Sequence, residues 1–190
     1  MLKNAFTPRT LVAYVEDKPG VLNRVASLFR RRAFNIVSLN VGGTHEQGVS
    51  RMTIVVDADE DTARRIVANL YKLVNVLRVD DITGDTSVIR NLALVKVAAG
   101  ASARAQVLQI CDVFRARAID IAPESLVLEI TGTEDKIQGL LQVLEPFGIL
   151  EVVQTGAVAM TRGNSAPAAE VAAGVAPAVA DSKLAAVRAA

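Results

Sequence analysis

The residues from Asp17 to Leu22 read Asp-Lys-Pro-Gly-Val-Leu, a combination suited to binding a small charged ligand. A proline near a first helical position costs no hydrogen bond, and a glycine lets another group approach the backbone closely. Gly20, Val21 and Leu22 are therefore expected to present their N–H groups from a helix N-terminus, which favours a carboxylate or phosphate. Asp17 beside them could accept an ammonium group. Together these features predict a site for a free amino acid.

A second interpretation of the same segment needs no ligand. The four residues Asp-Lys-Pro-Gly can simply turn the chain from strand into helix, with Asp17 capping the helix. Turn signals of this kind are common. The segment taken alone leaves both interpretations open.

Other reactive side chains are few. His45 is the only histidine and Cys111 the only cysteine, which argues against histidine-based catalysis, an intramolecular disulfide and a zinc site. We expect His45 to be an exposed residue of a hairpin loop and Cys111 to lie inert in a helix core. Asp80 and Asp81 are adjacent in a predicted strand, so they face opposite sides and cannot form a carboxylate pair.

Three consecutive arginines, Arg30 to Arg32, fall in the last turn of a predicted helix. Cations there complement the helix dipole. We expect a solvated helix end, and the alternative is a dedicated anion site. The glycines at positions 42, 43 and 48 join two predicted strands, so they do not form a phosphate loop, which must lead from a strand into a helix.

Composition limits the class of protein. The chain has 190 residues, 51% hydrophobic and 22% charged, with a net charge of +1. This is typical of a soluble globular protein with one large or two small domains. The near-neutral charge argues against nucleic acid or an acidic membrane as partner. Because no apolar run approaches ~20 residues and the N-terminus lacks a signal-peptide core, we expect a cytoplasmic protein.

Hydrophobic patterning predicts the order βαββαβ in the first part of the chain, with strands at 10–16, 34–41, 50–56 and 73–82 and helices at 21–32 and 59–70. This order is that of a ferredoxin-like unit, a four-stranded antiparallel sheet with two helices on one face. RNA-recognition domains share it, but the third strand here, SRMTIVV, has no aromatic residue on which a base could stack.

The second part of the chain repeats this order, with strands at 92–98, 118–121, 125–131 and 149–158 and helices at 103–116 and 134–144. LFRRRAFNI at 28–36 aligns without gaps with VFRARAIDI at 113–121. The predicted fold class is α+β, with two tandem ferredoxin-like modules. They cover residues 8–83 and 91–163, joined by a linker at 84–90, and an alanine- and proline-rich tail at 164–190 is expected to be mobile.

The segment TLVAYVEDKPGVLNRVASLFRRRAFNIVSLNVGG, followed by SRMTIVV, LYKLVNVLRV and RNLALVKV, closely resembles the small regulatory subunits of acetolactate synthase (acetohydroxyacid synthase). The turn D-x-P-G-V-L alone indicates an ACT domain, a module that binds amino acids in many regulators. The likeness extends over residues 10–163. It implies an N-terminal ACT domain and a C-terminal ACT-like domain.

The resemblance implies a non-catalytic chain that binds and activates a large catalytic subunit and confers feedback inhibition by valine or another branched-chain amino acid. Thiamine diphosphate, magnesium and FAD are expected on that subunit and none on this chain. The family further implies a homodimer in which two ACT domains pair edge to edge around valine. Matched by position, Asp17, Gly20, Val21 and Leu22 would come from one chain, and Asn35 and Ile36 from the other.

The second module lacks these residues. AAGASAR replaces the Asp-Lys-Pro-Gly turn, and Asp120 stands in place of Asn35, so we expect the C-terminal copy to have lost the effector pocket. Two other functions stay open: a tandem-ACT regulator that senses a different amino acid, and a small enzyme on a ferredoxin-like fold. The enzyme would need a convergent set of polar groups, which the sequence does not offer.

Overall fold

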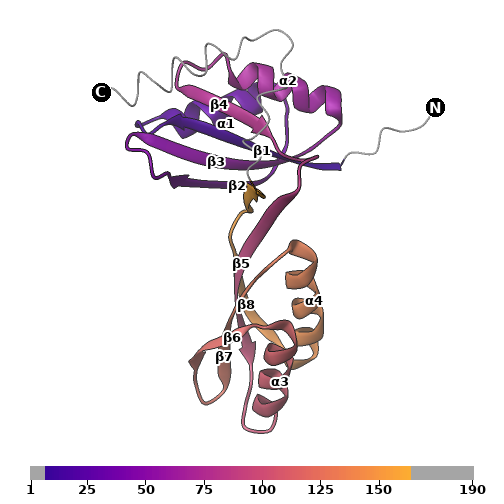
Figure 1. Cartoon of the computed structure of the whole chain (residues 1–190). Helices are drawn as coiled ribbons and strands as arrows, with labels where there is room; N and C mark the ends of the chain where they lie inside the picture. The colour runs from indigo at the N-terminus through magenta and orange to yellow at the C-terminus, as the bar shows by residue number, and fades with distance from the viewer. Residues whose placement is uncertain (1–6, 164–190) are drawn as a thin grey trace, which may run out of the picture. The chain divides into compact units, whose positions relative to one another are not determined.

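The computed structural model describes residues 7–163, which divide into two units (Figure 1). Unit 1 contains residues 7–88 together with 159–163, and unit 2 contains residues 89–158. The predicted tail at 164–190 lies outside the described residues. Within residues 7–163 no helix has the length and apolar character needed to cross a membrane.

Unit 1 has the predicted βαββαβ order. Its elements are β1 (Thr7–Glu16), α1 (Val21–Arg31), β2 (Ile36–Gly43), β3 (Val49–Ala58), α2 (Glu60–Leu70) and β4 (Val76–Asp81). The strands pair antiparallel in the order β2-β3-β1-β4, so β2 and β4 form the edges (Figure 1). This sheet and its two helices confirm a ferredoxin-like module.

The core of unit 1 follows from two periodicities. Val21, Val25 and Leu28 recur along one face of α1, while Leu11 and Val15 alternate along β1, and all are buried in one cluster. The apolar side chains of α1 and α2 thus cover the same face of the sheet. Leu22, although apolar and next to Val21, is 45% exposed.

Unit 2 repeats the arrangement with β5 (Ser87–Ala98), α3 (Arg104–Phe114), β6 (Arg117–Ile121), β7 (Ser125–Gly132), α4 (Glu134–Leu144), a short 3-10 turn (Glu145–Phe147) and β8 (Ile149–Gln154). A further strand, β9 (Val158–Thr161), begins at the last residue of unit 2 and continues into residues that belong to unit 1. The strand order is β6-β7-β5-β8, with β9 also paired to β5. The unit has its own hydrophobic cluster, which contains Cys111 as predicted.

Two predicted boundaries differ in the structure. β5 begins at Ser87, inside the predicted linker, because the β-branched Val88 and Ile89 extend the strand. The single strand expected at 149–158 is two strands, since residues 155–157, including Gly156, interrupt it. Residues 159–163 belong to unit 1, where the Arg51 guanidinium donates to the carbonyl oxygen of Ala159.

Candidate functional site

The predicted effector turn follows β1 and is held by the loops on either side. The N–H of Glu16 donates to the carbonyl oxygen of Asn75 at 2.9 Å, and that of Asp17 donates to the carbonyl oxygen of Gly48 at 2.8 Å. Gly48 belongs to the β2–β3 hairpin, and Asn75 precedes β4. The turn therefore starts from a fixed position at the end of the sheet.

Gly20 is the N-cap residue of α1 and has φ of 83°, in the left-handed region that favours glycine. A Cβ built at Gly20 would meet no atom within 4 Å, so the space beside it is open. The N–H of Val21 is already used, since it donates to the carbonyl oxygen of Lys18 at 3.3 Å. In the part of the chain that the structure describes, the N–H groups of Gly20, Leu22 and Asn23 have no acceptor.

These N–H groups differ in one member from the predicted set. Val21 cannot offer its N–H, whereas Asn23, which is not among the predicted donors, can. The sequence does not show this, because the same residues could leave the Val21 N–H to a ligand or donate it to the carbonyl oxygen of Lys18. A donor at the third helical position could have been expected from the general rule that the first helical N–H groups lack intrahelical acceptors.

The interpretation in which Asp17 caps the helix is wrong. No side chain caps α1, and the N-cap residue is Gly20. Asp17 is exposed beside the open turn. Its carboxylate is thus left to bind a cation from solution.

Val21 and Leu22 take opposite roles. The Val21 side chain is 4% exposed and packs in the core, so it fixes the helix start and cannot enclose a ligand. Leu22 is exposed next to the unpaired N–H groups. An apolar surface and hydrogen-bond donors therefore lie together at the start of α1.

Asn35 and Ile36 lie elsewhere in the chain. Asn35 is exposed just before β2, and Ile36 begins that edge strand and packs partly on the core. Ile36 pairs with Val56 of β3, whereas Glu16, next to the turn, pairs with Val49. Seven residues along β3 correspond to roughly 23 Å. One chain alone does not bring Asn35 and Ile36 to the Asp17–Leu22 turn.

The equivalent turn of unit 2 is filled by its own side chains. The Arg104 guanidinium donates to the carbonyl oxygens of Ala122 at 2.7 Å and Pro123 at 2.6 Å. A Cβ at Gly100 would lie 3.1 Å from the carboxylate of Glu124. The start of α3 is therefore closed where the start of α1 is open.

The other reactive side chains that the structure describes form no second site. Asp80 pairs with Arg78 at 2.9 Å and Asp81 with Arg9 at 3.4 Å, so the two carboxylates are not a catalytic pair. Burial raises the pKa of Asp80 above its usual value, against the opposing effect of Arg78, and burial also raises the pKa of the Cys111 thiol. Among residues 7–163 no three His, Cys, Asp or Glu side chains cluster to hold a metal ion.

Similarity to known proteins agrees with this geometry. Residues 11–78 match the family described as an AHAS small subunit-like ACT domain, and residues 90–163 match the family described as the small subunit of acetolactate synthase. The acetolactate synthase small subunit of Mycolicibacterium smegmatis is 48% identical over 162 residues, which cover 85% of this chain and 95% of that protein. A probable acetolactate synthase small subunit of Archaeoglobus fulgidus is 44% identical, covering 82% and 97%.

Among solved structures, the crystal structure of the acetolactate synthase small subunit from Thermotoga maritima superposes with a TM-score of 0.78 at 35% identity. The match covers 83% of this chain and 99% of that one. Both modules and most of the described residues are therefore shared with these proteins. The chain belongs to the family of acetolactate synthase small subunits, the regulatory subunits of that enzyme.

Proposed function

We propose that this chain binds the large catalytic subunit of acetolactate synthase, raises its activity and makes it sensitive to inhibition by valine. The large subunit would carry thiamine diphosphate, magnesium and FAD and would condense two pyruvates, or pyruvate with 2-oxobutyrate. The observation that carries the regulatory part is the open start of α1, where Gly20 leaves unpaired N–H groups beside an exposed carboxylate.

Each part of valine would have a partner of matching chemistry. The carboxylate would accept hydrogen bonds from the N–H groups of Gly20, Leu22 and Asn23, where the helix dipole also favours an anion. The ammonium group would lie against Asp17. The Leu22 side chain would cover the isopropyl group. Contacts of this kind suggest an affinity between micromolar and sub-millimolar, about −5 to −8 kcal/mol.

Asn35 and Ile36 would join this site from a second chain. Because they lie roughly 23 Å from the turn within one chain, only a dimer could bring them to the same ligand. The edge strand β2 would form that contact, since it exposes Val37 and Val41. We expect Val37→Glu to shift sedimentation velocity toward the monomer, whereas Val74→Glu, at a loop valine that is 76% exposed, should leave the dimer intact.

The function is tested by reconstituting the large subunit with this chain and following acetolactate formation while valine is added. Asn35→Ala should keep the activation and raise the valine concentration for half inhibition by tenfold or more, because one polar contact to the ligand is lost. Gln47→Ala, which removes an exposed amide from the β2–β3 hairpin, serves as the matched control. Undiminished valine sensitivity of Asn35→Ala would argue against the two-chain site, and the absence of activation by the unmodified chain would refute the regulatory function.

Leucine and isoleucine should be titrated in the same assay. The three amino acids share the carboxylate and ammonium groups and differ in the apolar part, which would rest on Leu22. The ranking of their half-inhibitory concentrations would therefore identify the preferred effector.

A further inference from the structure

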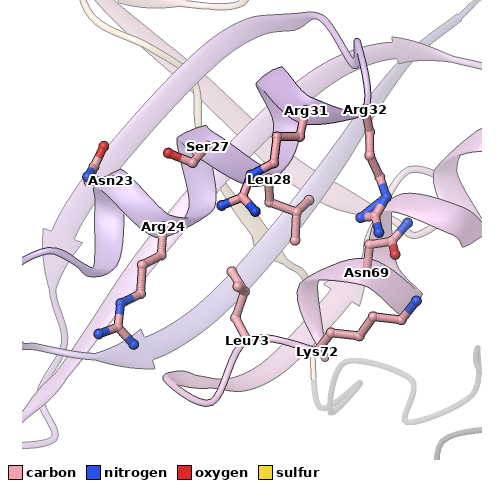
Figure 2. A pocket seen from close by; sticks show the side chains of 9 residues that line it. All are labelled: Asn23, Arg24, Ser27, Leu28, Arg31, Arg32, Asn69, Lys72 and Leu73. Carbon is pink, nitrogen blue, oxygen red and sulfur yellow. The ribbon is translucent and has the colours of Figure 1, made fainter.

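A groove in unit 1, between α1 and the end of α2, has features that binding valine does not use (Figure 2). It has a volume of about 580 Å³, within the range of ligand-binding clefts. Its lining residues are Asn23, Arg24, Ser27, Leu28, Arg31, Arg32, Asn69, Lys72 and Leu73. We call this feature the basic groove.

Four of the lining residues are cations and none is a carboxylate. Arg24 donates to the side-chain oxygen of Asn75 at 2.8 Å. For Arg31, Arg32 and Lys72, the described residues provide no ion pair. Like charges gathered on one surface repel one another, so an anionic partner would be attracted there.

The floor and length of the basic groove restrict that partner. Leu73, which is partly buried, lies between the cationic side chains and gives the floor an apolar surface, with the buried Leu28 next to it (Figure 2). Arg24 and Arg31 are seven residues apart on α1, which corresponds to roughly 10 Å along the helix axis. A single carboxylate or phosphate cannot span that distance, and neither would use the apolar floor. The partner should carry separated negative charges with an apolar group between them.

We propose that the basic groove binds an acidic segment of the large catalytic subunit, with an apolar side chain against Leu73 and carboxylates beside Arg24, Arg31, Arg32 and Lys72. This proposal rests on the proposed function, since the partner is the same. Charge complementarity across an interface of this kind speeds association and selects the partner.

The position of the basic groove also connects it to the effector turn. Asn23 lines the groove with its side chain, and its N–H is one of the unpaired donors at the start of α1. One helix would therefore contact valine at its end and the large subunit along its side. A change in the position of α1 on binding valine would reach the partner directly.

The test uses the full chain and the purified large subunit, with the dissociation constant measured at low and high salt. The double substitution Arg31→Glu with Lys72→Glu should weaken binding at low salt tenfold or more and flatten its salt dependence. The matched control is Arg30→Glu. It makes the same change at the neighbouring position of α1, which is exposed but does not line the groove, and it should alter affinity less than twofold.

Circular dichroism of each variant verifies the fold, and the milder pair Arg31→Gln with Lys72→Gln replaces the double variant if it does not fold. If the large subunit binds both variants and the unmodified chain equally, the basic groove is not its docking site. Binding of inorganic pyrophosphate, a small anion, and the dimer are measured for the same variants. If the double variant loses either of these but keeps its affinity for the large subunit, the proposal is likewise overturned. If the unmodified chain does not bind the large subunit at all, the proposed function fails as well.

Discussion

Gly20 is required by the fold and would also serve the proposed binding of valine. Its φ of 83° is strained for any residue with a Cβ, at a cost of about 1–2 kcal/mol. We expect Gly20→Ala to lower the free energy of unfolding of unit 1 by about that amount even without ligand. Tyrosine fluorescence during urea unfolding measures this directly, because both tyrosines, Tyr14 and Tyr71, lie in unit 1 and the chain has no tryptophan.

Gly42 provides the control for this substitution. A Cβ there would also meet open space, but Gly42 lies in β2 without a left-handed φ. Gly42→Ala should therefore not lower the unfolding free energy. Equal losses in the two variants would show that the backbone conformation of Gly20 is not what requires glycine.

Asp80 makes the stability of unit 1 depend on pH. Burial raises the pKa of Asp80 above 3.8, so the protonated form is favoured in the folded state. The stability that protonated Asp80 contributes is complete below the pKa of this residue in the unfolded chain. It is lost as pH rises through the higher pKa of Asp80 in the folded chain. We expect Asp80→Asn to gain stability relative to the unmodified chain as pH is raised from about 3.8 toward 7, measured by urea unfolding at several pH values. A constant difference across this range would contradict the prediction.

Local sequence was informative for the Asp17–Leu22 turn because Pro19 and Gly20 act through their own backbone. It was not informative where a distant residue decides the outcome. The closing of the unit 2 turn depends on Arg104 reaching the carbonyl oxygens of Ala122 and Pro123, and no local pattern indicates that contact. The basic groove likewise combines Arg31 with Lys72, which only the packing of two helices brings together.

At the scale of elements, the helices of unit 1 begin in different ways. The Asp59 side chain caps α2 by accepting a hydrogen bond from the N–H of Thr62 at 2.7 Å, whereas α1 has no side-chain cap. Asp59→Ala should lower the unfolding free energy of unit 1 by about 1 kcal/mol. Asp61→Ala removes a nearby carboxylate whose exposed pair with Arg64 contributes little, about 0.5 kcal/mol at most. The unfolding free energies of both variants are measured by tyrosine fluorescence. If Asp59→Ala and Asp61→Ala lose the same amount, the cap is not the cause.

Periodicity predicted the existence and order of the elements because each strand and helix buries one face. Val25 and Phe29 of α1 are buried at the four-residue spacing of one helix face. The ends of elements were less predictable. Leu22 has the apolar character of a core residue, but it is exposed next to the buried Val21, which takes the core position in the first turn of α1. The break between β8 and β9 at residues 155–157 was not predicted, because valines on both sides of it favour a strand.

At the scale of the whole molecule, the two units have separate hydrophobic cores. The single cysteine, Cys111, is buried in unit 2, so thiol labelling reports on that unit as tyrosine fluorescence reports on unit 1. We expect Asp59→Ala to lower the urea midpoint seen by tyrosine fluorescence and to leave the midpoint of Cys111 labelling within error. Parallel shifts of both midpoints would show that the units unfold as one.

Unit 2 interrupts unit 1 in the chain, since residues 159–163 return to the first unit. Arg51 finds the carbonyl oxygen of Ala159 across 108 residues of sequence. During synthesis the ribosome must therefore complete all of unit 2 before unit 1 can make this bond. A chain released early, at any point within 89–158, would carry a nearly finished unit 1 that still lacks its last contacts.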